Sequence, residues 1–183
     1  MMIDETPSSL PTPEFSRPLN VESLKIGKSE QTLEATPDEC AQLAQRFDLL
    51  TLDHLSANVQ LNRKGAGDSI RVFVSGRLNA GITQSCVITL DPVSSEIEAD
   101  FNAAFDSEAE DIKSDCDFDI SNDDIAEPII DGSIDLGELV AQYLAVEIDP
   151  FPRKEGADGS GMTLESANTE TNPFSVLKKL KSE

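Results

Sequence analysis

The chain has 183 residues, and its 35 acidic and 14 basic side chains give a formal net charge of −21 at neutral pH. This charge excludes a protein whose surface binds nucleic acid broadly, because such a surface must carry clustered cations. The length fits one domain, and the hydrophobic fraction of 38% lies below the usual value of about 45–50%. Part of the chain is therefore expected to lie outside the packed core.

Neither a membrane span nor a secretion signal is recognisable. No window approaches the roughly 18 consecutive apolar residues of a spanning helix, and residues 1–14 lack the apolar run of a signal peptide. Cys40, Cys86 and Cys116 are far apart and odd in number, so they do not describe a disulfide framework. We expect a soluble protein of the cytoplasm, a reducing compartment.

The acidity is regional. Residues 91–149 hold 19 acidic residues and a single base, Lys113, which amounts to −18, whereas the rest of the chain is nearly balanced. Such a block either faces water and solubilises the protein or attracts a basic partner.

Residues 1–15 are expected to be a disordered tail, because the prolines and polar residues of this stretch cannot bury enough apolar area to offset the entropy of ordering. A helix is predicted from Pro37 to about Phe47. Thr36, just before the helix, and Glu39 in its first turn form a capping-box pair. Its apolar positions recur every three or four residues, so one face should pack on a larger element.

After this helix the pattern changes to a period of two. Residues 56–62 and 70–74 alternate polar and apolar side chains around a break at 64–68, which predicts a β-hairpin. The glycines in 76–81 allow another turn or bulge, and 85–90 and 97–101 predict two further strands.

The alternation in residues 115–120 places Asp115, Asp117 and Asp119 on one side if this segment is a strand. A second helix is predicted over 135–147, with Asp135 as its cap and a regular apolar stripe. We therefore predict an α+β fold with one domain over residues 16–152. Its antiparallel meander of five or six strands is covered by two helices, and a barrel-like curl is an alternative to an open sheet.

A flexible linker is expected over 153–171, where glycine and small polar residues dominate. Residues 172–183 predict a short basic amphipathic helix that gains order by docking, either on a partner or on the protein's own body. Its candidate partner-binding residues are Asn172, Pro173, Phe174, Leu177, Lys178, Lys179, Leu180 and Lys181.

Catalytic and metal signatures are weak. His54 is the one histidine, so it is the sole imidazole base for a hydrolase, and no G-x-S-x-G motif frames a serine. The run from Asp115 to Asp119 fails as a calcium loop, since Ile120 and Ala126 occupy positions that need Gly and Glu. No C-x-x-C or H-x-x-x-H pair suggests zinc. No catalytic residue, cofactor or metal is therefore assigned.

Three segments, taken in order, resemble the YceD family, the large ribosomal RNA subunit accumulation proteins. They are the strand pair 72–76 and 84–90, the helix start 134–139 leading to the prolines of 149–153, and the ending N-P-F-x-x-L-x-x-L over 172–180. The resemblance implies a bacterial, cytoplasmic, non-enzymatic factor needed for accumulation of 23S ribosomal RNA. Many members carry C-x-x-C where this chain has Cys86 and Thr89, and cysteines where it has Arg153 and Lys154, so a metal or redox role does not carry over.

The main hypothesis is a ribosome-biogenesis protein that binds a basic ribosomal or assembly protein through the acidic surface of residues 91–149. Direct contact with ribosomal RNA would use Lys178, Lys179 and Lys181, the densest basic cluster. The alternatives are an acidic interaction module or nucleic-acid mimic unrelated to ribosomes, and a hydrolase built on Cys86 or His54.

Overall fold

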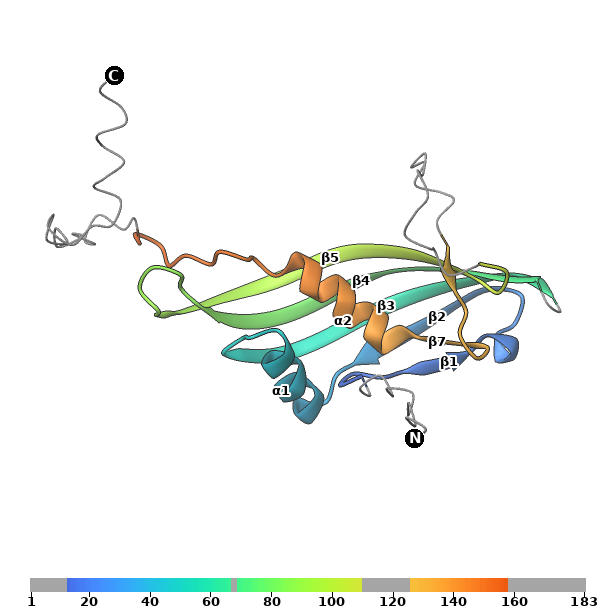
Figure 1. The fold of residues 1–183 in the computed structure, drawn as a ribbon, viewed down its shortest axis with the longest axis horizontal. Coiled ribbons are helices and arrows are strands. Elements are labelled where there is room, and N and C mark those ends of the chain that lie inside the picture. Colours follow the sequence, from blue (N-terminus) through green and yellow to red (C-terminus); the bar gives the residue numbers. More distant parts are fainter. Residues whose placement is uncertain (1–12, 67–68, 110–125, 158–183) are drawn as a thin grey trace, which may run out of the picture.

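The computed structural model describes residues 13–66, 69–109 and 126–157 (Figure 1). In chain order its elements are β1 (Pro18–Asn20), η1 (Val21–Ser23), β2 (Gly27–Glu34), α1 (Pro37–Arg46), β3 (Thr51–Ala66), β4 (Ser69–Ser85), β5 (Pro92–Asp106), β6 (Glu127–Pro128), β7 (Ser133–Asp135) and α2 (Leu136–Glu147).

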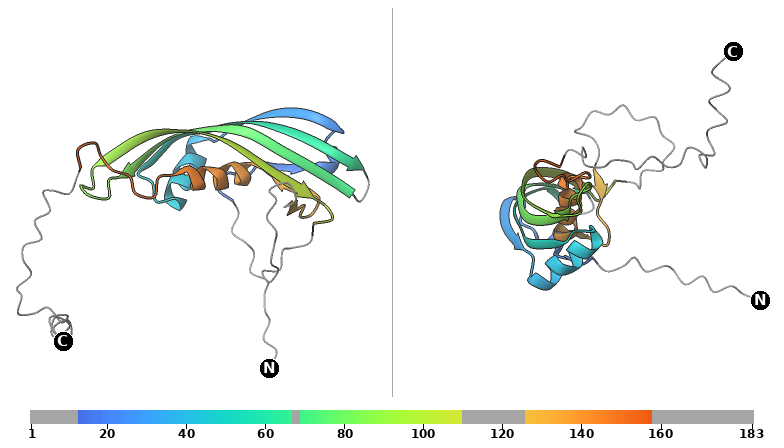
Figure 2. Two further views of the ribbon diagram at one scale, coloured as in Figure 1. Left: turned by 90° about the horizontal axis from the view of Figure 1, so that it is seen from above. Right: turned by 90° about the vertical axis from the view of Figure 1, so that its left-hand side faces the viewer.

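The main sheet has five strands in the order β2-β3-β4-β5-β6, and β1 pairs with β7 in a small second sheet. Strands β2 to β5 are consecutive and antiparallel, which confirms the predicted α+β meander, while β6 pairs with the end of β5 in parallel. The sheet is strongly curved but open, so the barrel-like alternative is not realised (Figure 2). Both helices lie on its concave side.

The two helices begin where their caps predict. The Thr36 hydroxyl accepts from the Glu39 N–H, and the Glu39 carboxylate accepts from the Thr36 N–H at 2.7 Å. Asp135 caps α2 by accepting from two backbone N–H groups of its first turn. Arg46 near the end of α1 then donates to both carboxylate oxygens of Glu138, at 2.9 and 2.8 Å, which joins the two helices.

The core lies between the concave side of the sheet and the helices. Its largest fully buried side chains include Leu43, Leu55, Leu78, Ile82, Leu136 and Leu144. Phe15, which the sequence assigned to the tail, is 0% exposed and belongs to this core. Lys154, which was predicted to belong to the linker, is hydrogen-bonded to the folded domain, because its N–H donates to Cys86 Sγ. The packed region thus extends past both predicted boundaries.

Two local predictions are wrong. Residues 76–81 form no turn, since β4 continues through them, and the irregularity lies instead in β3 between Leu52 and His54. Residues 85–90 are not a third strand, because they contain the turn between β4 and β5. The predicted tail up to residue 12, the strand 115–120 and the terminal helix 172–183 lie outside the described residues. None of the described helices is long and apolar enough to cross a membrane.

Candidate functional site

Neither of the described helices lies on the convex side of the main sheet, which we call the outer face (Figure 2). Its side chains come from alternate positions of β2 to β5, and strand pairing arranges them in rows across the sheet. One row contains Glu34, Ser56, Asn79 and Glu98. The next contains Thr32, Asn58, Arg77 and Asp100. Polar residues therefore cover a face that in a two-layer fold is free to meet a partner.

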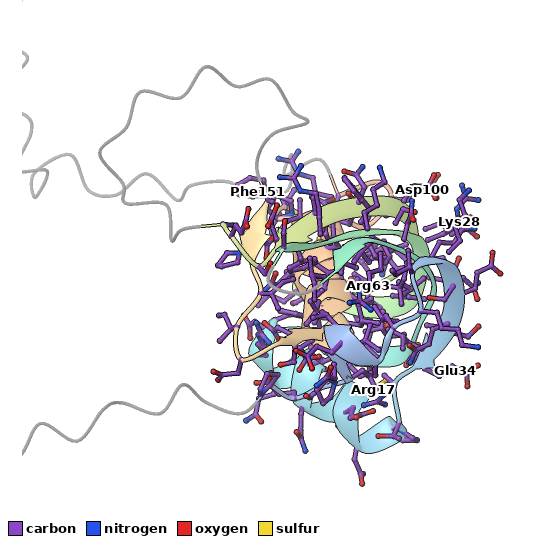
Figure 3. All side chains as sticks on the ribbon, turned by 90° about the vertical axis from the view of Figure 1, so that its right-hand side faces the viewer. Arg17, Lys28, Glu34, Arg63, Asp100 and Phe151 are labelled. Carbon is purple, nitrogen blue, oxygen red and sulfur yellow. The ribbon has the colours of Figure 1, made fainter. Side chains whose placement is uncertain are left out.

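Four exposed carboxylates lie toward the end of the outer face where β5 begins, three on β5 and one across the sheet on β2. We call this group the acidic face, and its members are Glu34, Glu96, Glu98 and Asp100. Glu34 and Asp100 project from the sheet on the side away from α2 (Figure 3). Three of the four follow one another at alternate positions of β5, within the acidic block that the sequence identified, and Glu34 joins them from β2 through the strand pairing.

Neighbouring basic side chains neutralise only part of the negative charge of the acidic face. The Arg77 guanidinium donates to both Asp100 oxygens, at 2.7 and 2.9 Å, and these hydrogen bonds lower the pKa of Asp100. His54 Nε2 lies 3.5 Å from a Glu96 oxygen. Among the described residues, no ion pair involves Glu34 or Glu98. These carboxylates are accessible to an outside cation.

The opposite end of the outer face is basic. Lys28 and Lys64 are exposed there, and the Lys64 ammonium lies 4.7 Å from the centre of the Phe73 ring. Arg71 is at the same end, but it is occupied by Asp106 at 2.7 Å. The lysines of the outer face thus lie at the end opposite the acidic face, although the exposed Glu30 is only two residues from Lys28 on the same strand face.

A broad hollow of about 650 Å³ lies between these two ends. It is lined by residues of β2 to β5, which include Glu30, Thr32, Asn58, Ser75, Arg77 and Asp100. Its amides and hydroxyls can donate and accept hydrogen bonds, and Glu30, Arg77 and Asp100 add charged groups. The hollow is a polar contact area and lacks the apolar walls typical of small-molecule sites.

Cys86 occupies a separate place, in the turn between β4 and β5. Its side chain is buried under the segment that follows α2, where the Val87 N–H donates to the Pro152 carbonyl at 2.9 Å. The N–H of Lys154 and the side chain and N–H of Thr89 donate to the sulfur and lower the pKa of the Cys86 thiol to about 6. Hydrogen bonds to the thiolate favour the ionised form, which explains this direction.

The structure does not assemble a hydrolase from Cys86 and His54. The sulfur accepts from the backbone of Thr89 and Lys154, while the imidazole lies on the outer face beside Glu96. Of the positions where the family resemblance suggests further cysteines, 89 and 154 contact the Cys86 sulfur through their N–H groups. They carry Thr and Lys, which are not zinc ligands. Among the described residues, no three His, Cys, Asp or Glu side chains are grouped to hold a metal ion.

The predicted partner-binding residues, from Asn172 to Lys181, lie outside the described part of the chain. The outer face was not foreseen as a unit, although the acidic block over 91–149 pointed to β5. A signal was present in the alternation of Glu96, Glu98 and Asp100, since a period of two places side chains on one face of a strand.

The described residues thus define an α+β protein whose prominent surface feature is a charged, helix-free sheet face. The chain matches the family model described as large ribosomal RNA subunit accumulation protein YceD over residues 74–181. This match covers more than half of the 183 residues, and the chain belongs to the YceD family. No curated protein and no solved structure matches it. The matched region begins within β4 and contains β5, which carries Glu96, Glu98 and Asp100 of the acidic face, and α2.

Proposed function

We propose that this chain is a non-enzymatic ribosome-biogenesis factor that binds a basic ribosomal or ribosome-assembly protein through the acidic face. The family name ties the chain to accumulation of large-subunit ribosomal RNA and names no reaction. The observation that carries the proposal is the presence of Glu96, Glu98 and Asp100 on β5, with Glu34 across the sheet on β2, on a face that neither described helix covers. Ribosomal proteins are a natural class of partner for such a surface, because RNA binding requires them to be basic.

The electrostatics support a protein partner more than direct RNA binding at this end of the sheet. Carboxylates attract lysine and arginine side chains and repel phosphates. The Glu96 side chain is 74% exposed and the Asp100 side chain 71%, so each contact contributes little alone and is weakened by salt. Their joint effect is to speed association and orient the partner.

The C-terminal segment would contribute a second contact. In this proposal Phe174, Leu177 and Leu180 dock on the partner, and Lys178, Lys179 and Lys181 approach ribosomal RNA. A chain ending at residue 171 tests this part. It should keep the thermal unfolding midpoint of the full chain and bind the partner more weakly, and unchanged binding would remove the segment from the proposal.

The acidic face is tested with the proteins extracted from purified large ribosomal subunits. The full chain, immobilised, should retain a defined basic protein from this mixture after nuclease treatment and release it as salt is raised. A variant with Glu34→Gln, Glu96→Gln and Glu98→Gln should retain it at least about threefold less well, from roughly 0.2–1 kcal/mol per exposed ion pair.

The matched control neutralises three exposed acids off the acidic face, by Asp131→Asn, Glu147→Gln and Glu155→Gln. It changes the net charge equally, so it should retain the bound protein as the unmodified chain does. Equal losses in both variants would show a response to net charge alone and would overturn the proposed surface. Retention of RNA but of no protein would overturn the proposed class of partner.

A further inference from the structure

Among the residues that the structure describes, one edge of the main sheet has no strand partner along most of its length. β5 pairs with β4 from Pro92 to Asp106, but on its other side β6 meets only Phe105 and Asp106. Among the described residues, no strand lies beside positions 92–104. A strand edge with free N–H and C=O groups can accept another strand.

The hydrogen-bonding direction of this edge follows from two observed contacts. The Asn102 carbonyl accepts from the Tyr143 hydroxyl, and the Asp106 carbonyl accepts from the Ile129 N–H, so both carbonyls point away from β4. In an antiparallel strand the N–H and C=O of one residue point to the same side, and this side alternates along the chain. Ser94, Glu96, Glu98 and Asp100 therefore present their backbone groups at the open edge.

The side chains along the edge alternate in chemistry with the same period. Glu96, Glu98 and Asp100 are exposed on the outer face, whereas Ile97 and Ala99 are half-buried on the side of the core. In an added antiparallel strand, residues opposite the acids would lie on the outer face at about 5.5 Å between Cα atoms. Residues opposite Ile97 and Ala99 would continue the apolar side.

From this we infer that the β5 edge binds an extended peptide of alternating basic and apolar residues as an additional antiparallel strand. The inference rests on the proposed function and deepens it, because it states the conformation and sequence pattern in which the basic partner is recognised. The basic residues would pair with Glu96, Glu98 and Asp100, and backbone hydrogen bonds would hold the segment in register.

A second copy of this chain is a poorer occupant of the edge. Pairing two β5 strands would place carboxylates of both copies next to each other on the outer face, and like charges on adjacent strands destabilise a sheet. The same carboxylates favour a partner with cations at alternate positions. Charge therefore selects a basic strand over self-association.

The test uses a soluble peptide in which lysine and valine alternate over a length that spans Ser94 to Asp100. Its binding to the full chain is measured by fluorescence anisotropy, and amide hydrogen exchange reports on the edge. The alternating peptide should bind and should slow exchange of the Glu96 and Glu98 amides. A peptide with the same residues in separate lysine and valine blocks should bind at least about fivefold more weakly, because it cannot match the period of the strand.

Two substitutions at Glu98 distinguish binding through backbone hydrogen bonds from binding through charge attraction. Glu98→Pro removes an N–H that faces the open edge and leaves the β4 hydrogen bonds intact, so it should fold and weaken binding about tenfold. Glu98→Gln keeps this N–H and should weaken binding only about two- to threefold. If the proline variant does not fold, a peptide methylated on the lysine backbone nitrogens supplies the same comparison, because those N–H groups would face β5.

Binding that is insensitive to Glu98→Pro and to methylation would show simple charge attraction and overturn the inference. Absence of binding, or edge amides already protected in the free full chain, would also overturn it. The proposed function is tested separately by the Glu34, Glu96 and Glu98 glutamine variant. A ribosomal protein that depends on the acidic face but is unaffected by Glu98→Pro would leave the proposed function standing and remove the added strand.

Discussion

The ring of Phe101 occupies the space in which a side chain on Gly76 would stand. A Cβ atom on Gly76 would lie 2.7 Å from Phe101 Cζ and 2.5 Å from the Asn58 carbonyl oxygen. The ring also packs against Tyr143 of α2, with the two ring centroids 5.2 Å apart. Because Gly76 has no side chain, the Phe101 ring can pack directly against β4. The same ring contacts Tyr143 and so helps to position α2.

Gly76→Ala is expected to destabilise the protein by about 1–3 kcal/mol, the usual cost of overpacking a well-packed site. Urea unfolding followed by circular dichroism measures this change. Ser75→Ala, at the next position on the exposed outer face, is the control and should change stability by less than about 0.5 kcal/mol. Equal stability of the Gly76 variant and the unmodified protein would contradict the packing argument.

The hydrogen bonds to the Glu39 carboxylate predict that the stability of the fold depends on pH. The Arg17 side chain donates to both of its oxygens, and together with Thr36 it lowers the pKa of Glu39 to about 2. A carboxyl with a lowered folded-state pKa stabilises the fold above its ordinary pKa, and this contribution is lost as pH falls toward 2. Glu39→Gln should therefore cost about 1 kcal/mol at pH 7 and less near pH 2.

Urea unfolding of the Glu39 variant and the unmodified protein at both pH values measures this difference. Asp38→Asn is the matched control, since Asp38 is an exposed acid of the same helical turn. A gap between the Glu39 variant and the unmodified protein that stays constant from pH 7 to pH 2 would contradict the assignment.

The Cys86 thiol should ionise below its ordinary range, at a pKa of about 6. In a protein with Cys40 and Cys116 replaced by alanine, the thiolate absorbance near 240 nm should rise around this pH. Because the lowered pKa favours the folded state above about 8.5 and this gain is lost as pH falls to 6, Cys86→Ala should cost more stability at pH 9 than at pH 5.5. A midpoint at or above 8.5 would show that the backbone donors do not act as described.

Replacing either of two phenylalanines outside the main strands should have very different effects on the stability of the protein. Phe15 is 0% exposed and Phe151 is 68% exposed. Phe15→Ala should cost about 3–5 kcal/mol, as for other large side chains removed from a core, whereas Phe151→Ala should cost less than about 0.5 kcal/mol. Thermal unfolding of the two variants compares them directly, and similar midpoints would refute the inclusion of Phe15 in the core.

Local chemistry explains which elements were predictable. Both helices were found because Thr36, Glu39 and Asp135 are strong N-terminal signals, and their caps form as expected. β2 was missed because it lies at an edge of the sheet and buries only Leu33, so it shows no apolar alternation. Gly76 was predicted to belong to a turn or bulge, although it allows a close contact inside a strand.

The turn at Cys86 misled the prediction for a different reason. Its run of apolar and β-branched residues has the composition of a strand, but Leu90 adopts a positive φ of 63° and the chain reverses there. The acidic face was only half predictable, because Glu98 belongs to an obvious acidic block whereas Glu34 joins it through the pairing of four strands. Long-range pairing of this kind leaves no mark in a local sequence window.

The two sheets differ greatly in the number of residues that separate their paired strands along the chain. β3 and β4 meet first at Ala66 and Ser69 and then extend pair by pair, so every step encloses only a few more residues. β1 pairs with β7 from Pro18 opposite Asp135 to Asn20 opposite Ser133, and closing so long a loop costs about 3 kcal/mol more than closing a tight turn. The N-terminal segment is therefore expected to join last during folding and to detach first during local unfolding, while the long hairpin persists.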